Sequence, residues 1–250
     1  MAFRLLCITA HPDDEAGAFG GALLMAAASG VETSVVCLTE GAAGSYRAAG
    51  QSDAELAEIR RQEFAAGCKA LGVRDWTILD YPDGGLYLEP LVGMAGVLVA
   101  EIRRLRPHVV VTFGADGGVN LHRDHTMISL AATAAFHWAG RSGFYPEQLE
   151  GGTEVWAPQK LYYASTPFLA TRDEQALQTG ARVPRSLTLE LREWKERKYA
   201  AFLEHSSQRG VLERVRAEFD EEMGEEGYLL VAARAPDYPD SSMFAGVIEE

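Results

Sequence analysis

Residues 3–15, FRLLCITAHPDDE, join an apolar run to a turn that carries one histidine and three acidic side chains. The run over residues 3–9 is short and mostly apolar, which predicts a buried strand. The small-residue stretch over residues 15–29 predicts a helix that packs closely on a sheet. A strand followed by a turn and a helix begins a βαβ unit, and its polar turn lies at the carboxyl end of the strand.

The same alternation of short apolar runs and helical patterns continues to about residue 140. It predicts three further strands, over residues 33–39, 75–79 and 108–113. It also predicts three further helices, over residues 53–71, 89–105 and 124–138, with Asp53 as the N-cap of the first. Strands separated by helices predict an α/β fold class: a doubly wound, mainly parallel, Rossmann-like sheet with helices on both faces.

The chain after residue 140 is less regular. Its patterns predict strands over residues 160–165, 186–191 and 228–233 and a helix over residues 191–203. No linker with a shift in composition divides the chain. We therefore expect one domain over residues 1–250, in which a Rossmann-like core (1–140) is joined by a C-terminal extension (141–250) that completes the pocket.

Composition and charge narrow the classes of function. The chain has 250 residues, 47% of them hydrophobic, and a core of that size needs no disulfides. Its formal net charge of −13 disfavours binding to nucleic acid or to an anionic membrane surface. The three cysteines form no C-x-x-C pattern, which is typical of reduced, buried thiols. The longest apolar stretch, residues 16–29, contains three glycines and is too short to span a bilayer. With no secretory signal, these features predict a cytoplasmic protein; they do not decide whether its copies form a homo-oligomer.

The turn after the first predicted strand holds His11, Asp13 and Asp14. In open α/β sheets, ligands bind at the carboxyl ends of the strands. His11 and Asp14 are three residues apart and could converge on one ion, since zinc accepts imidazole nitrogen and carboxylate oxygen. The alternative is structural, because either aspartate could cap the helix that follows.

A second polar cluster, His122, Asp124 and His125, follows the predicted strand at 108–113 through a glycine-rich loop. The two histidines are three residues apart, which places them on one face of a helix that has already started. Asp124 is available to orient an imidazole. A lone histidine here would be read as structural, whereas two with a carboxylate favour a functional site.

Together, the two polar clusters predict a single site. In the common doubly wound orders, the first strand neighbours the strand that begins the reversed half of the sheet, so the two polar turns face each other. His11, Asp14 and His125 then form a site with two imidazoles, one carboxylate and open positions, the form of a catalytic zinc site. Asp13 and His122 remain beside it as candidate base and acid. We expect Zn²⁺, and Fe²⁺ suits the same ligand set.

The ordered motifs resemble those of a known family. AHPDDE at residues 10–15, with HRDH at residues 122–125, resembles the PIG-L/LmbE-like family of zinc-dependent N-acetylglucosaminyl deacetylases. Three further stretches are similar to the family's pattern. They are TEGAAGS at 39–45, IRRQE at 59–63 followed by LGV at 71–73, and Lys198 followed by HSSQ at 205–208.

The resemblance implies roles for individual residues. His11, Asp14 and His125 would bind the metal, and Asp13 would be the general base. His122 would stabilise the oxyanion, as an imidazolium, or protonate the leaving amine, with Asp124 supporting it. Arg60 would contact sugar hydroxyls. Asp83, in the loop after the third predicted strand, is either a turn residue or a substrate contact.

Two positions depart from the family pattern. Arg123 stands where proline is common in the second motif, and this change alters loop rigidity or adds positive charge at the mouth of the site. Ala42 stands where an acidic residue is common, which puts the usual contact with a sugar hydroxyl in question. Neither change removes a proposed metal ligand.

The sequence therefore predicts a hydrolase that removes the acetyl group from an N-acetylated amino sugar or its glycoside. It leaves open whether this is a free sugar, a thiol-precursor glycoside or an antibiotic intermediate. A nucleotide-binding protein is disfavoured because no G-x-G-x-x-G or P-loop motif is present. An iron(II) oxygenase is disfavoured because strands and helices alternate. The remaining alternative is a non-catalytic metal- or sugar-binding module, for which Asp13 and His122 are not needed.

Overall fold

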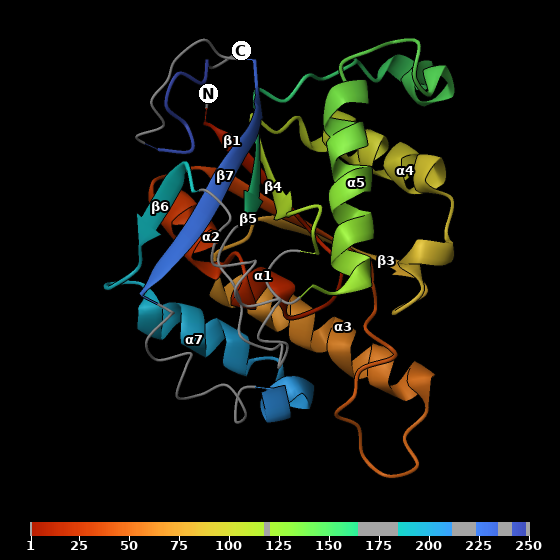
Figure 1. Cartoon of the computed structure of the whole chain (residues 1–250), viewed down its shortest axis with the longest axis vertical. Coiled ribbons are helices and arrows are strands. Elements are labelled where there is room, and N and C mark those ends of the chain that lie inside the picture. Colours follow the sequence, from red (N-terminus) through yellow and green to blue (C-terminus); the bar gives the residue numbers. More distant parts are fainter. Residues whose placement is uncertain (1, 118–120, 165–184, 212–223, 235–241, 249–250) are drawn as a thin grey trace.

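The computed structural model describes residues 2–117, 121–164, 185–211, 224–234 and 242–248. Within these residues the strands form one seven-stranded sheet of order β3-β2-β1-β4-β5-β7-β6 (Figure 1). The first five of these strands run parallel, and β7 pairs antiparallel with both β5 and β6. The strands are β1 (Arg4–Thr9), β2 (Glu32–Thr39), β3 (Asp75–Tyr81), β4 (Val109–Phe113), β5 (Lys160–Ala164), β6 (Leu187–Glu190) and β7 (Glu225–Ala233).

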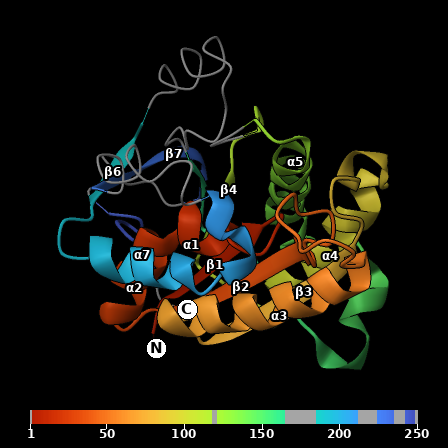
Figure 2. The same ribbon diagram turned by 90° about the horizontal axis from the view of Figure 1, so that it is seen from below.

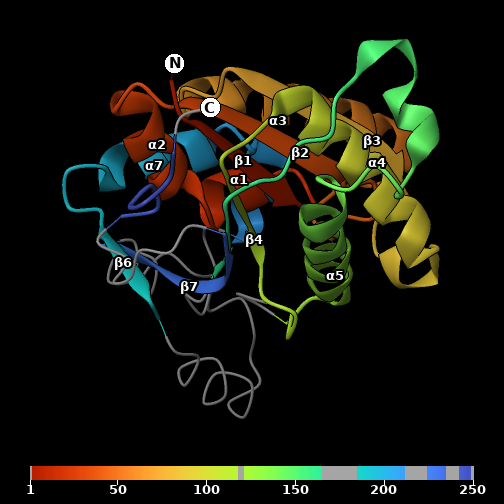
Figure 3. The same cartoon turned by 90° about the horizontal axis from the view of Figure 1, so that it is seen from above.

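Helices cover both faces of this sheet, as the sequence predicts. The longer helices are α2 (Gly20–Ala28), α3 (Asp53–Ala70), α4 (Leu91–Leu105), α5 (Arg123–Trp138) and α7 (Lys195–Leu203). Figures 2 and 3 show α3 and α7 on one side of the strands and α4 and α5 on the other. Helices α3 and α7 pack together, as do α4 and α5. Among the described residues, no helix combines the length and the apolar character needed to cross a membrane.

The strand adjacency on which the site depends is confirmed. β1 pairs in parallel with both β2 and β4, with Leu5 opposite Val109. β4 is buried along its whole length, because helices cover both of its faces. The carboxyl ends of β1 and β4 therefore lie side by side, and the turns that follow them face each other.

Two details of the predicted helices are wrong. The single helix predicted over residues 15–29 is two, α1 (Asp14–Gly17) and α2, because Phe19 leaves helical geometry with φ −126° and ψ 2°. The Phe19 ring is fully buried, 5.1 Å from the ring of Phe113, so tertiary packing breaks the helix. Ser52, not Asp53, is the N-cap of α3, since Ser52 and Glu55 form a reciprocal capping box.

The C-terminal strands are confirmed with shifted ends. β7 begins three residues before the predicted 228, and α7 begins at Lys195 rather than 191. Ser165, the predicted end of β5, lies outside the described residues.

A buried carboxylate joins the C-terminal elements to the core. Glu226 of β7 accepts hydrogen bonds from the backbone N–H groups of Gly21 (2.6 Å) and Ala22 (2.9 Å) at the start of α2. It also binds Lys198 Nζ of α7 at 2.6 Å and the Tyr228 hydroxyl at 2.7 Å. Donors at a helix N-terminus favour a negative charge, so Glu226 ties β7 and α7 to α2.

Candidate active site

A cavity of about 530 Å³ opens at the carboxyl ends of the parallel strands. The turns after β1, β2, β3 and β4 supply much of its wall, and the C-terminal part of the chain supplies Phe202, Gln208 and Val211. Its lining residues are His11, Asp13, Asp14, Gly17, Ala18, Ala43, Gly44, Ser45, Tyr46, Arg60, Asp83, Gly84, Phe113, His122, His125, Phe202, Gln208 and Val211. Seven of the eight predicted site residues line this one cavity, and the eighth, Asp124, is buried beside His11.

The turn after β1 fixes the carboxylate of Asp14. Its Oδ2 accepts hydrogen bonds from the backbone N–H groups of Ala10 (3.1 Å) and His11 (2.8 Å). Its Oδ1 lies 3.3 Å from His125 Nε2, and its Oδ2 lies 3.6 Å from His11 Nδ1. Burial opposes the charge, but His125 and His11 hold the pKa of Asp14 well below its ordinary value. Asp14 is therefore an ionised carboxylate between two imidazoles.

Two further carboxylates orient His11 from its other side. His11 Nε2 lies 3.1 Å from Asp124 Oδ2 and 3.1 Å from Asp83 Oδ1. Asp124 is itself fixed by the backbone N–H groups of Gly84 (2.7 Å) and Leu86 (3.2 Å). Burial opposes protonation, but the hydrogen bonds with these carboxylates and with Asp14 raise the pKa of His11 well above its ordinary value. The surroundings of His11 therefore favour a positive charge.

The turn after β4 supplies the other two histidines. His125, on α5, stacks its ring on Phe113 with centroids 3.8 Å apart and planes 3° from parallel. His122 is the N-cap of α5, where its Nδ1 accepts a hydrogen bond from the backbone N–H of Asp124 at 3.2 Å. Burial and the charges of His11 and His125 lower the pKa of His122. These features favour a neutral His122 ring with its proton on Nε2, in place of the imidazolium expected from the sequence.

The position of Asp124 adds a second contact to its expected support of His122, which stays a prediction. The Asp124 side chain is fully buried and contacts His11 and the backbone after β3, and the Asp124 backbone N–H donates to His122. A carboxylate that holds the far nitrogen of a metal-binding imidazole is a common arrangement in metal sites. The structure thus places Asp124 behind His11.

Asp13 has an unusual backbone. Its φ is 111°, in a region that non-glycine residues rarely adopt and that costs of the order of 1–3 kcal/mol. Its carboxylate lies 3.1 Å from Arg60 Nη2, and its N–H donates to Glu15 Oε2 at 3.0 Å. Burial raises the pKa of Asp13 to about 7, against the opposing effect of Arg60. A carboxyl group with a pKa near neutrality suits a general base.

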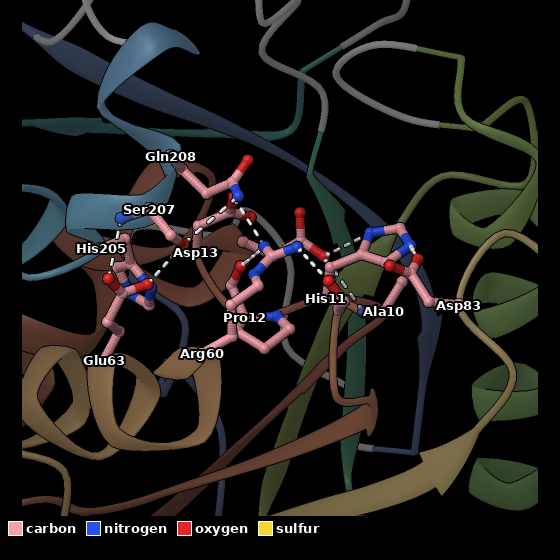
Figure 4. Close-up of polar contacts among 12 residues, drawn as sticks. Ala10, His11, Pro12, Asp13, Arg60, Glu63, Asp83, His205, Ser207 and Gln208 are labelled. Carbon is pink, nitrogen blue, oxygen red and sulfur yellow. Dashed lines mark hydrogen bonds and ion pairs between the residues drawn. The ribbon is translucent and has the colours of Figure 1, made fainter. Parts of the chain in front are cut away.

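Arg60 is buried, and its guanidinium binds the protein's own atoms. It donates to the carbonyl oxygen of Gly41 at 2.9 Å. It also donates to the carbonyl oxygen of Pro12 and to the carboxylate of Asp13 (Figure 4). Arg60 lines the cavity, but these contacts make it a support of the turns after β1 and β2. Its predicted contact with sugar hydroxyls stays a prediction. The two residues that depart from the family pattern both contact other parts of the protein. The Arg123 guanidinium stacks 5.6 Å from the centre of the Tyr87 ring, and the Ala42 carbonyl oxygen accepts a hydrogen bond from Arg47 at 2.7 Å.

Two groups among the described side chains have ligand atoms close enough to share a metal ion. One is His11, His122 and His125, and the other is His11, Asp83 and Asp124, each with ligand atoms within 4.8 Å of one another. The predicted set of His11, Asp14 and His125 is neither of these. Asp14 nevertheless lies within 3.6 Å of both imidazoles, so the predicted set stays a prediction.

Sequence analysis assigned no individual role to Glu15 or to His205. Both are fully buried, and His205 Nε2 lies 2.6 Å from Glu15 Oε1. The neighbouring Glu63 binds Ser206 and Ser207, as Figure 4 shows for Ser207. The sequence did indicate that both residues matter, because Glu15 ends the AHPDDE motif and His205 begins the HSSQ motif. Nothing in either motif says that the two are partners.

A comparison with models of protein families finds one match to this chain. The model of the PIG-L family, described as GlcNAc-PI de-N-acetylase, matches residues 6–136, more than half of the chain. The chain belongs to this family. The matched part contains all eight predicted site residues, so the family pattern and the cavity coincide.

Curated proteins similar to the chain include sugar deacetylases. One is 1D-myo-inositol 2-acetamido-2-deoxy-alpha-D-glucopyranoside deacetylase 1 of Catenulispora acidiphila. It is 34% identical over 189 residues, which cover 66% of this chain and 57% of that protein. The chain spans about 60% of the length of the curated relatives it matches first.

Solved structures with this fold catalyse more than one reaction. N,N'-diacetylchitobiose deacetylase from Pyrococcus horikoshii aligns with a TM-score of 0.76 and 22% identity, covering 92% of this chain and 84% of that one. The 4-carboxy-2-hydroxymuconate hydratase GalB from Pseudomonas putida aligns with a TM-score of 0.72 and 22% identity, covering 94% of this chain and 99% of that one. The fold alone therefore does not decide the reaction.

Proposed function

We propose that the chain is a metal-dependent hydrolase that removes the acetyl group from an N-acetylated amino sugar or its glycoside. The observation that carries the proposal is the position of Asp13. Its partly buried carboxyl group lines the same cavity as His11, Asp14, His122 and His125. A metal- or sugar-binding module needs no such base, whereas hydrolysis of an unactivated amide does. The sugar deacetylases among the curated relatives support the substrate class.

The donor set fits a divalent metal ion. Asp14 is ionised and lies between His11 and His125, and two more carboxylates hold the far side of His11. We infer that His11, Asp14 and His125 would hold the ion, with Asp83 and Asp124 orienting His11. Imidazole nitrogen with carboxylate oxygen suits Zn²⁺ first and Fe²⁺ second. When bound, such an ion supplies Lewis acidity, which makes water more acidic and polarises an amide carbonyl.

The chain's own residues then divide the proton transfers. Asp13 takes a proton from the attacking water as the new C–O bond forms at the acetyl carbon. The Nε2–H of His122 faces the developing oxyanion and donates a hydrogen bond to it. The C–N bond breaks once the amine nitrogen takes up the proton that Asp13 has gained, and acetate and a free amine leave. Arg60 keeps the Asp13 carboxylate in place throughout.

The lining of the cavity favours a polar but uncharged ligand beside the metal site. Its walls combine Tyr46, Phe202 and Phe113 with the amide of Gln208 and the hydroxyl of Ser45. Arg60 is the one lysine or arginine among the described lining residues, and it is bound to Asp13. Aromatic faces with a few polar groups suit a sugar ring. We therefore propose an uncharged N-acetylglucosamine glycoside as the substrate class.

The test is acetate release from a panel of N-acetylglucosamine glycosides. Wild type is compared with Asp13→Asn and with the metal-stripped protein. Asp80→Asn is the control variant, because it makes the same change of aspartate to asparagine at an exposed carboxylate. We expect Asp13→Asn to lower kcat by about 10²–10⁴-fold while it still binds metal, and Asp80→Asn to behave as wild type. Activity lost on stripping should return with Zn²⁺ or Fe²⁺. Tight metal binding with no acetate from any glycoside would reject the proposal in favour of another amide or a binding module.

A further inference from the structure

The backbone of Asp13 is held by a buried pair that joins the two ends of the family pattern. The Asp13 N–H donates to Glu15 Oε2 at 3.0 Å, and Glu15 Oε1 lies 2.6 Å from His205 Nε2. Glu15 and His205 are both fully buried, although 190 residues separate them. One carboxylate thus connects the proposed base to a residue in the segment after α7.

The structure leaves room for this pair and for little else. Gly67 of α3 lies beside it, and a Cβ atom at Gly67 would stand 2.7 Å from His205 Nε2 and 2.9 Å from Glu15 Oε1. No hydrogen-bond partner of His205 Nδ1 is found among the described residues. The hydrogen bond to Glu15 therefore orients the ring of His205, and the ring fixes the carboxylate of Glu15.

The unusual conformation of Asp13 makes this support consequential. A residue at φ 111° relaxes toward ordinary backbone angles unless its surroundings hold it. Arg60 holds the Asp13 carboxylate, and Glu15 holds its N–H. If Glu15 swings away, the Asp13 N–H loses its partner and the backbone can relax, so that Arg60 alone holds the carboxylate while the Cα atom that carries it moves.

We propose that His205 is a positioning residue that acts through Glu15 to fix Asp13 for proton transfer. This inference rests on the proposed function for the role of Asp13. Among the described residues, the one hydrogen bond found for the His205 side chain is to Glu15, and its contacts with the cavity lining are by its backbone, to Phe202 and Gln208, and by its ring, 6.2 Å from that of Phe202. Its effect on catalysis therefore passes through Glu15 and Asp13.

Three variants at or beside this position separate positioning from folding. His205→Leu removes the hydrogen bond, and His205→Gln keeps an N–H near the place of Nε2. Ser206→Ala is the matched control, because it removes a 2.7 Å hydrogen bond to Glu63 from the next residue of the same segment. We expect His205→Leu to lower kcat by about 10–100-fold with KM and metal content unchanged, since a small misplacement of a catalytic group has effects of this size. His205→Gln should recover most of the loss, and Ser206→Ala should behave as wild type.

A double-mutant cycle tests the route. In an Asp13→Asn background, His205→Leu should lower the residual kcat no further, because the group it positions is already absent. Equal losses in both backgrounds would overturn the inference and leave the proposed function intact. A fall in kcat with Ser206→Ala equal to that with His205→Leu would also overturn it.

Hydrogen exchange gives a readout that needs neither substrate nor metal. In metal-stripped protein, the Asp13 amide should exchange faster in His205→Leu than in wild type, and His205→Gln and Ser206→Ala should protect it as wild type does. Protected exchange in His205→Leu would refute the coupling. If wild type hydrolyses no acetamide yet this exchange pattern holds, the proposed function fails and the coupling of His205 to Asp13 stands.

Discussion

Lys198→Met is expected to destabilise the whole domain. Lys198 Nζ lies 2.6 Å from Glu226 Oε1, with the two side chains 5% and 2% exposed. Removing one partner of a buried ion pair costs about 3–5 kcal/mol, because the other charge stays buried without compensation. Here Glu226 keeps hydrogen bonds from Gly21, Ala22 and Tyr228, so we expect the lower end, about 3 kcal/mol. For a chain of this length that lowers Tm by roughly 6–12 °C.

The assay is denaturant unfolding followed by circular dichroism, without metal or substrate. Arg197→Met is the matched control, since Arg197 is an exposed cation on the same helix with a contact to the Trp194 ring. Its loss should change the free energy of unfolding by less than about 1 kcal/mol. If Lys198→Met is no more destabilising than Arg197→Met, the argument from a buried, compensated charge is refuted.

Three smaller predictions test local geometry. Ser52→Ala should cost about 0.5–2 kcal/mol of unfolding free energy and Asp53→Ala much less, which denaturant unfolding of both will distinguish. Gly67→Ala should destabilise by about 1–3 kcal/mol despite the better helix propensity of alanine, because its Cβ meets His205 and Glu15; a more stable variant would contradict this packing. Burial opposes protonation of His205, but Glu15 raises its pKa in the folded state above the unfolded value of about 6.5, so its stabilising effect is complete below that pH and is lost as pH rises through the folded value. The difference in unfolding free energy between wild type and His205→Gln should therefore shrink with rising pH. A difference that grows with pH would mean that folding lowers the pKa of His205, against this prediction.

The sequence predicted the sheet because its signals are local and repeated. Each parallel strand is a short apolar run, and helical patterns separate the runs, so the doubly wound order leaves β1 beside β4. That adjacency brings the turns with His11 and His125 together. The break at Phe19 was not predictable from residues 15–29, because it depends on a ring from β4.

The partners within the site were harder to predict than its members. Asp124 is one residue from His125 and two from His122, which suggests that it supports one of them. Its contact with His11 instead depends on where the backbone after β3 places its N–H groups. Glu15 and His205 are a similar case, since their contact crosses from α1 to the segment after α7. Motifs identify the residues that matter, but hydrogen-bond partners follow from tertiary packing.

The metal ligand set can be decided without any substrate. Besides the group of His11, Asp83 and Asp124, two arrangements share His11 and His125: the predicted set completed by Asp14, and the compact group completed by His122. We favour the first, because Asp14 faces both imidazoles whereas Nδ1 of His122 caps α5. A ligand that binds only the folded state at 100 times its Kd adds about 2.7 kcal/mol of stability, so Zn²⁺ should raise Tm by roughly 5–10 °C.

Asp14→Asn and His122→Gln should differ in how far Zn²⁺ raises their Tm. If the first arrangement holds, Asp14→Asn should abolish most of the rise in Tm, since it would remove a charged ligand, and Asp80→Asn should leave the rise intact. His122→Gln should lower the baseline Tm slightly by weakening the helix cap, and should keep most of the rise. A full rise in Asp14→Asn with none in His122→Gln would assign the ion to the three histidines. His122 would then be a ligand, so it could not donate Nε2–H to the oxyanion.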